Sequence, residues 1–144
     1  MPQTRTVIER RWSSHPGNVH YARLTVRQTV ERYLGSDIDL IELAIGEACA
    51  NAIEHGSPSG EQNSFIVRCL IVPELKSLIF EVEDEGADFN IKGLSLSQLP
   101  DLTSEGGRGL FLINSIMDDV ALHSLGHGLM VRMTKRVAVW PPED

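Results

Sequence analysis

The chain has 144 residues, a formal net charge of −7 and 42% hydrophobic residues. This length suits a single domain over residues 1–144, and the apolar fraction is sufficient for a hydrophobic core without disulfide bonds. The acidic balance argues against direct nucleic-acid binding, because phosphate contacts require a surplus of Lys and Arg. No apolar run approaches the roughly 18 residues that span a bilayer, and no signal-peptide pattern is present, so we expect a cytoplasmic protein without a membrane partner.

The N-terminal half of the chain predicts one strand followed by two helices. β-branched residues and then charges over 4–12 predict a strand at the edge of a sheet. Apolar residues at three- and four-residue steps predict a helix over 18–34, which a glycine closes. A second helix over 38–55 follows, and either Ser36 or Asp37 can cap its start.

The C-terminal half predicts further strands around a long irregular segment. Two runs rich in β-branched residues, 64–72 and 77–83, predict a hairpin. The segment 84–109 is rich in Gly, Asp and Ser, and a loop of this length in a compact domain is usually functional. A third helix is predicted over about 108–118. Two more strands and a frayed tail are expected over 119–125, 129–137 and 138–144. This order of elements predicts one α/β domain.

The second helix is apolar on most of its surface but carries a polar stripe. At about 100° per residue, Glu47, Asn51 and Glu54 align on the side opposite its apolar residues. Because the rest of this helix is expected to be covered, the stripe should face something specific. A solvated strip is the alternative interpretation of a Glu/Asn pair taken alone.

A carboxylate stands at the end of the strand predicted over 77–83. Asp84 ends the strand, and Gly86 permits a sharp turn directly afterwards. A carboxylate fixed at a strand end can accept a hydrogen bond from an exocyclic amine such as adenine N6. Taken alone, the same pattern also fits a simple acidic turn.

Three glycines, Gly106, Gly107 and Gly109, stand just before the third apolar helical run. They place unobstructed backbone N–H groups and the positive end of a helix dipole where phosphates could bind. A flexible hinge is the alternative. The pattern is neither a Walker loop, because no Gly-Lys-Ser/Thr follows, nor the dinucleotide-binding fingerprint.

Together and in this order, the three features resemble the GHKL ATPase superfamily, and within it the anti-sigma factor serine/threonine kinases of the RsbW and SpoIIAB kind. The family motif EAxxNAxxHG corresponds to EACANAIEHG at residues 47–56. The middle motif corresponds to DEGADF at 84–89, with Asp88 where many members have Gly or Ser, and the last to GRGL at 107–110. The resemblance covers nearly the whole chain. It implies the Bergerat-type ATP-binding fold, an α/β two-layer sandwich in which a mixed, mostly antiparallel sheet carries helices on one face.

The resemblance also implies an activity and its residues. It implies an ATP-dependent serine/threonine protein kinase that phosphorylates an anti-sigma factor antagonist and acts as an anti-sigma regulatory factor. Glu47 is then the general base, and Asn51 is a ligand of Mg²⁺. Asp84 recognises adenine, Gly86 lets the backbone approach the base, and 92–106 form the ATP lid. Contacts to the phosphates are implied for Gly106, Gly107, Arg108, Gly109 and Leu110.

Two positions depart from the family pattern. SpoIIAB-like members carry an arginine in the lid near Glu105, and many members have a threonine where this chain has Leu129. A side-chain contact to phosphate is therefore not expected at Leu129. Neither departure affects Glu47, Asn51 or Asp84.

The partners implied by the resemblance are ATP, an antagonist protein, a sigma factor and a second copy of the chain, for which the leading strand offers an edge. One alternative is a nucleotide-binding regulatory module that sequesters a sigma factor or another partner without kinase activity. Glu47 favours the kinase, because nucleotide binding alone needs no base. Another alternative is the ATP-binding piece of a histidine kinase, which is disfavoured because no phosphoacceptor hairpin precedes residue 1. The histidines lack the spacing of a zinc site.

Overall fold

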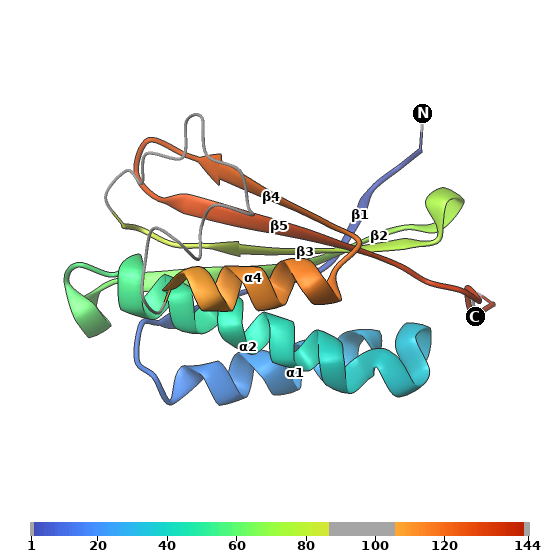
Figure 1. Ribbon diagram of the computed structural model, residues 1–144, viewed down its shortest axis with the longest axis horizontal. Coiled ribbons are helices and arrows are strands. Elements are labelled where there is room, and N and C mark those ends of the chain that lie inside the picture. Colours follow the sequence, from blue (N-terminus) through green and yellow to red (C-terminus); the bar gives the residue numbers. More distant parts are fainter. Residues whose placement is uncertain (1, 87–105, 143–144) are drawn as a thin grey trace.

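The computed structural model describes residues 2–86 and 106–142, without the side chains of 106–108 (Figure 1). Three short 3-10 turns connect the main elements: η1 (Gly35–Asp37), η2 (Gly60–Gln62) and η3 (Pro73–Leu75). The helices and strands are β1 (Arg5–Ser13), α1 (Asn18–Leu34), α2 (Ile38–His55), β2 (Ser64–Val72), β3 (Ser77–Glu83), α4 (Gly106–Ile116), β4 (Asp119–Ser124) and β5 (Leu129–Arg136).

The described strands form one five-stranded sheet in the order β1-β2-β3-β5-β4. All four described pairings are antiparallel. β3 is the central strand, and its last residue, Glu83, pairs with Ile66 of β2 and with Met130 of β5. The chain therefore leaves β3 at the middle of one end of the sheet.

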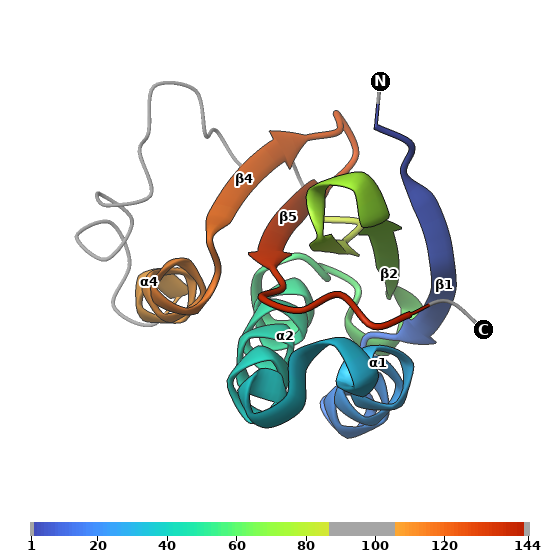
Figure 2. The same ribbon diagram turned by 90° about the vertical axis from the view of Figure 1, so that its right-hand side faces the viewer.

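The helices cover one face of the sheet and enclose the core with it (Figure 2). β2 shows how the sequence sets this arrangement, because Phe65, Val67 and Cys69 are buried while the residues between them are partly exposed. A period of two is the pattern of a strand with one covered face. α2 contributes Ile41 and Ile45, both fully buried, to the same core. The expected two-layer α/β sandwich is confirmed.

The start of one helix and the cap of another differ from the sequence-based expectation. α4 begins at Gly106, so the glycines form its first turn instead of preceding it. Asp37 is the residue before α2 but makes no side-chain cap bond, because η1 carries the chain directly from α1 into α2.

The expectation of a frayed tail is wrong for residues 138–142. The ring of Trp140 lies 4.6 Å from that of Tyr33 between centroids, and Arg32 donates to the Pro142 carbonyl at 2.7 Å. These contacts fix the end of the chain to the last turn of α1. No helix in the described part of the chain has the length and apolarity to cross a membrane.

Candidate functional site

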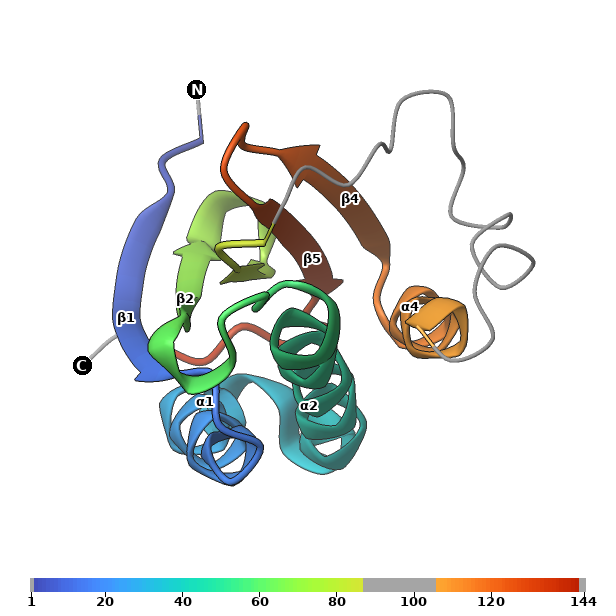
Figure 3. The same cartoon turned by 90° about the vertical axis from the view of Figure 1, so that its left-hand side faces the viewer.

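The polar stripe of α2 faces the first turn of α4. Figure 3 looks at the end of the molecule where α2 ends and α4 begins. A Cβ atom built on Gly109 would lie 3.1 Å from Glu47 Oε2 and 3.2 Å from Asn51 Nδ2. Gly109 is buried, and the next residue, Leu110, packs against the core. The structure thus brings together the polar stripe of α2 and the glycine-rich start of α4, two of the three features that the sequence indicated.

The first turn of α4 is made of residues 106–109. The first four N–H groups of an α-helix have no partner within the helix, and the dipole places a partial positive charge there. This turn therefore presents backbone donors beside Glu47 and Asn51. The side chain of Arg108 and residues 92–105 of the expected lid lie outside the described part of the chain.

The side chain of Asn51 has a buried polar atom that is available to a ligand. Its Nδ2 atom has no hydrogen-bond partner among the described residues. A buried amide without a partner costs roughly 1–3 kcal/mol, so such groups are rare unless something binds them. The two ends of a carboxamide exchange by rotation. Asn51 can therefore turn its oxygen to a cation or its nitrogen to a phosphate oxygen.

Asp84 is held at the end of β3 by the backbone. Its side-chain Oδ1 accepts from the N–H of Gly86 at 3.0 Å and from that of Leu129 at 2.9 Å. Its own N–H donates to the Leu129 carbonyl at 3.0 Å. Asp84 is 8% exposed, and this burial raises the pKa of its carboxyl while the two backbone N–H groups oppose the rise. Because Oδ1 is engaged, Oδ2 is the oxygen that remains for a ligand.

Three glycines allow the backbone to close around this carboxylate. A Cβ on Gly56 would lie 2.0 Å from Asp84 Oδ2, and one on Gly128 would lie 2.0 Å from the Asp84 carbonyl oxygen. A Cβ on Gly86 would lie 2.7 Å from the Cα of Gly56. No side chain fits at these points, so Asp84 is enclosed by main chain. The sequence motifs included Gly56 and Gly86 but not Gly128, whose only signal was its place directly before Leu129.

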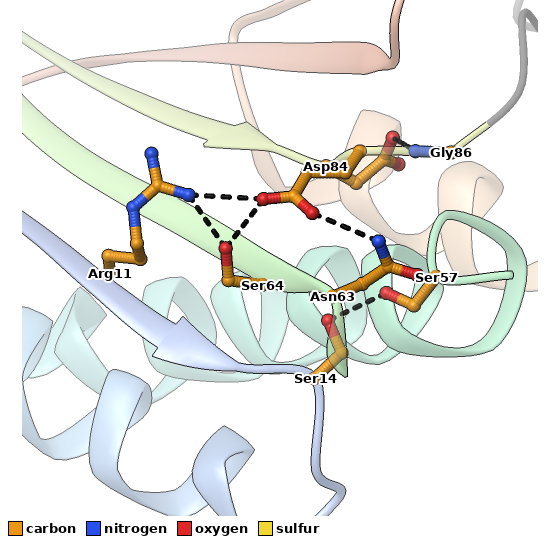
Figure 4. A network of polar contacts seen from close by, with 8 residues as sticks. Arg11, Ser14, Ser57, Asn63, Ser64, Asp84 and Gly86 are labelled. Atoms are coloured by element: carbon orange, nitrogen blue, oxygen red, sulfur yellow. Dashed lines mark hydrogen bonds and ion pairs between the residues drawn. The ribbon is translucent and has the colours of Figure 1, made fainter. Parts of the chain in front are cut away.

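A second set of polar contacts holds the residue after Asp84 (Figure 4). The carboxylate of Glu85 accepts from Ser64 Oγ at 2.7 Å, from Asn63 Nδ2 at 2.9 Å and from Arg11 Nη1 at 3.1 Å. The hydrogen bonds from Asn63 and Ser64 lower the pKa of Glu85. Sequence reasoning missed this network, because its members come from β1, from the residues around the start of β2 and from the turn after β3, and follow no local pattern.

The donor set is consistent with Mg²⁺ held mainly by a nucleotide. No group of three or more His, Cys, Asp or Glu residues within the described segments could hold a metal ion. Mg²⁺ typically takes only one or two protein oxygens and keeps water and phosphate oxygens as its other ligands. The unpartnered amide of Asn51, next to Glu47 and the first turn of α4, is compatible with that coordination.

Comparisons with known proteins identify relatives of the chain. A family model described as the histidine kinase-like ATPase domain matches residues 12–135. Serine-protein kinase RsbW of Bacillus pumilus is 31% identical to the chain, over 94% of this chain and 88% of that protein. Serine-protein kinase RsbW of Bacillus subtilis is 30% identical, over 89% of this chain and 84% of that protein.

A solved structure shares the fold. It is the crystal structure of the RsbU and RsbW domains of Rv1364c from Mycobacterium tuberculosis, with a TM-score of 0.63 and 15% identity. The match covers 90% of this chain and 31% of that longer chain.

Proposed function

The chain belongs to the histidine kinase-like ATPase domain family and, within it, to the serine/threonine protein kinases of the RsbW kind, and from this we propose that it phosphorylates an anti-sigma factor antagonist and so regulates a sigma factor. ATP is the phosphoryl donor of this kinase. The proposal rests mainly on one observation: the side chains of Glu47 and Asn51 lie directly beside Gly109 in the first turn of α4. A base, an unpartnered amide and helix N–H donors then converge on one place.

Glu47 would act as the general base in phosphoryl transfer. Its carboxylate takes the proton from the serine or threonine hydroxyl of the antagonist as that oxygen attacks the γ-phosphorus. The bond from the γ-phosphorus to the bridging oxygen breaks, and ADP leaves with the electron pair. The N–H groups of residues 106–109 would stabilise the negative charge on the phosphate oxygens.

Asn51 and Asp84 would hold the two ends of the nucleotide. Mg²⁺ bound with ATP would offset the negative charge of the phosphates. Asn51 would supply one oxygen to that ion from the same helical face as Glu47. Asp84 would accept the adenine exocyclic amine on Oδ2, the oxygen that its backbone bonds leave available.

The remaining partners follow from the family and from the open edge of the sheet. We propose two mutually exclusive complexes in the cytoplasm, one with a sigma factor and one with the antagonist. We also propose a homodimer that uses β1, which pairs only with β2 among the described strands and so presents an edge to a second copy.

The test is phosphorylation of the antagonist encoded nearest the gene of this chain, with labelled ATP. Glu47→Gln should reduce the transfer rate by roughly 10²–10⁴-fold, because the amide cannot accept the proton, while ATP affinity is retained. Asn51→Ala should lower Mg²⁺-dependent ATP affinity together with transfer. Glu54→Gln is the matched control, because Glu54 is exposed two turns along the same helix. Transfer at the unaltered rate by Glu47→Gln would remove Glu47 as the base.

A further inference from the structure

The carboxylate of Glu85 ties the Asp84–Gly86 turn to two other strands. It accepts one hydrogen bond from β1, through Arg11, one from Ser64, the first residue of β2, and one from Asn63, the residue before it. Arg11 also donates to Ser64 Oγ at 2.6 Å, so these two donors hold each other in place (Figure 4).

One of these donors also fixes the loop that follows α2. Asn63 accepts from the Ser59 N–H at 2.6 Å through its side-chain oxygen while its nitrogen donates to Glu85. The loop that contains Ser59 begins directly after Gly56, the residue against which Asp84 Oδ2 lies. Glu85 therefore links the turn that carries Asp84 to the loop that follows Gly56, the two segments that meet in this contact.

This contact has little tolerance for displacement. The distances of 2.0 Å and 2.7 Å from the built Cβ atoms at Gly56 and Gly86 mean that backbone lies directly against Asp84 and its turn. A small shift of the turn would move Oδ2 relative to a bound base, and hydrogen bonds weaken steeply with distance and angle.

We propose that Glu85 is a positioning residue for nucleotide binding, which fixes the turn so that Asp84 Oδ2 meets the exocyclic amine of adenine; this rests on the proposed function. Glu85 touches neither the base nor the phosphates in this role. It acts through its three donors, which hold the turn from the side opposite Gly128.

If Glu85 acted through its charge, Glu85→Gln would raise the affinity for adenine nucleotides instead of lowering it. The pKa of Asp84 is raised first by burial and, to a smaller extent, by the like charges of Glu83 and Glu85. Removing the charge of Glu85 would therefore favour ionised Asp84 and would strengthen its bond to an amine. Loss of affinity in Glu85→Gln would thus report position and not charge.

The experiment measures ADP and GDP affinities by calorimetry for the full chain with Mg²⁺. In Glu85→Gln the new amide nitrogen faces donors, so at least one bond to Asn63, Ser64 or Arg11 is lost. We expect ADP affinity to fall about tenfold while the weaker GDP affinity stays unchanged, so that the adenine preference shrinks. Glu61→Gln, an exposed glutamate of η2, is the matched control and should keep both affinities.

A second variant separates positioning from a general loss of fold. In the double variant Glu85→Gln with Asn63→Asp, the glutamine nitrogen can donate to the new carboxylate, which still accepts from Ser59. We expect this exchange to restore most of the ADP affinity. Unchanged or higher ADP affinity in Glu85→Gln, or an equal loss for ADP and GDP without rescue, would overturn the positioning role alone. Absence of ADP binding by the unaltered chain would remove the proposed function and this inference with it.

Discussion

At the scale of single residues, Asp84 offers a test of base recognition. In Asp84→Asn the side-chain oxygen must stay with the N–H groups of Gly86 and Leu129, which leaves the NH₂ group at the position of Oδ2. A donor then faces the donor of adenine. We expect ADP affinity to fall at least about tenfold in calorimetry. Asp39→Asn, an exposed aspartate paired with Arg27, is the control; equal affinity of both variants would place Asp84 outside the site.

The same carboxyl predicts how nucleotide binding depends on pH. Because burial raises the folded pKa of Asp84 above its ordinary value of 3.8, the folded state binds the proton first as the pH falls. As the pH falls through this raised pKa, protonation of Asp84 adds stability to the fold but removes the charged acceptor. ADP affinity should therefore decline without loss of stability from this group, and Asp84→Asn should flatten the decline.

The carboxyl of Glu85 sets the lower end of the pH range in which the effect of Asp84 can be measured alone. The folded pKa of Glu85 is lowered by its bonds from Asn63 and Ser64, so its contribution to stability is lost only as the pH falls below its ordinary value of 4.5. Thermal melts at each pH, run beside the calorimetry, separate the two effects. A fall of melting temperature that parallels the loss of ADP affinity while the pH is still above 4.5, the ordinary pKa of Glu85, would contradict the assignment to Asp84.

At the scale of elements, the junction of α2 and α4 is tested by filling the space at Gly109. Gly109→Ala should stabilise α4 by about 0.5–1 kcal/mol through helix propensity, set against a close contact with Glu47 and Asn51. Nucleotide affinity and phosphoryl transfer should fall, because the new methyl group enters the space between these side chains and the helix. Asn114→Ala, on an exposed position of α4, is the control. Full activity in Gly109→Ala would show that this junction is not the site.

Elements with a clear period were predictable, and contacts between distant segments were not. The bounds of α1, α2, β2 and β3 coincide with the predicted ranges. In α1, α2 and β2 the buried residues recur at a regular spacing, whereas β3 is buried almost throughout and was indicated by its short apolar run. The stripe of α2 also indicated Glu47 and Asn51. The start of α4 was less predictable, because glycine-rich sequence suits a loop as well as a helix that the surrounding fold holds in place.

The candidate site shows the same division. Asp84 was recognisable from its position at the end of a strand, but the N–H groups that hold it come from Gly86 and, 45 residues away, from Leu129. The network of Glu85 draws on Arg11 and Asn63 in the same way. Pairings of this kind are set by the strand order and register, which the spacing of apolar residues in one sequence does not specify.

At the scale of the whole molecule, the chain end stabilises the fold far from the site. The packed tail lies at one end of the long axis and the start of α4 at the other (Figure 1). Trp140→Ala should remove the contact with Tyr33 and cost roughly 1–2 kcal/mol, a drop in melting temperature of about 3–8 °C. ADP affinity should not change. Val139→Ala, at a residue that is 80% exposed, is the control; an equal drop for both variants would contradict the packing role of Trp140.

Because β3 is the central strand, the part of the site around Asp84 is expected to resist local unfolding. Amide hydrogens exchange with solvent through local openings, and inner strands of a sheet open least because both neighbours must separate. β3 has β2 on one side and β5 on the other, and the ladder continues to the bond from the Asp84 N–H to Leu129. The carboxylate therefore stays in place through fluctuations that fray the sheet edges. Release of nucleotide would then depend on movements elsewhere in the molecule and not on opening of the strand that carries Asp84.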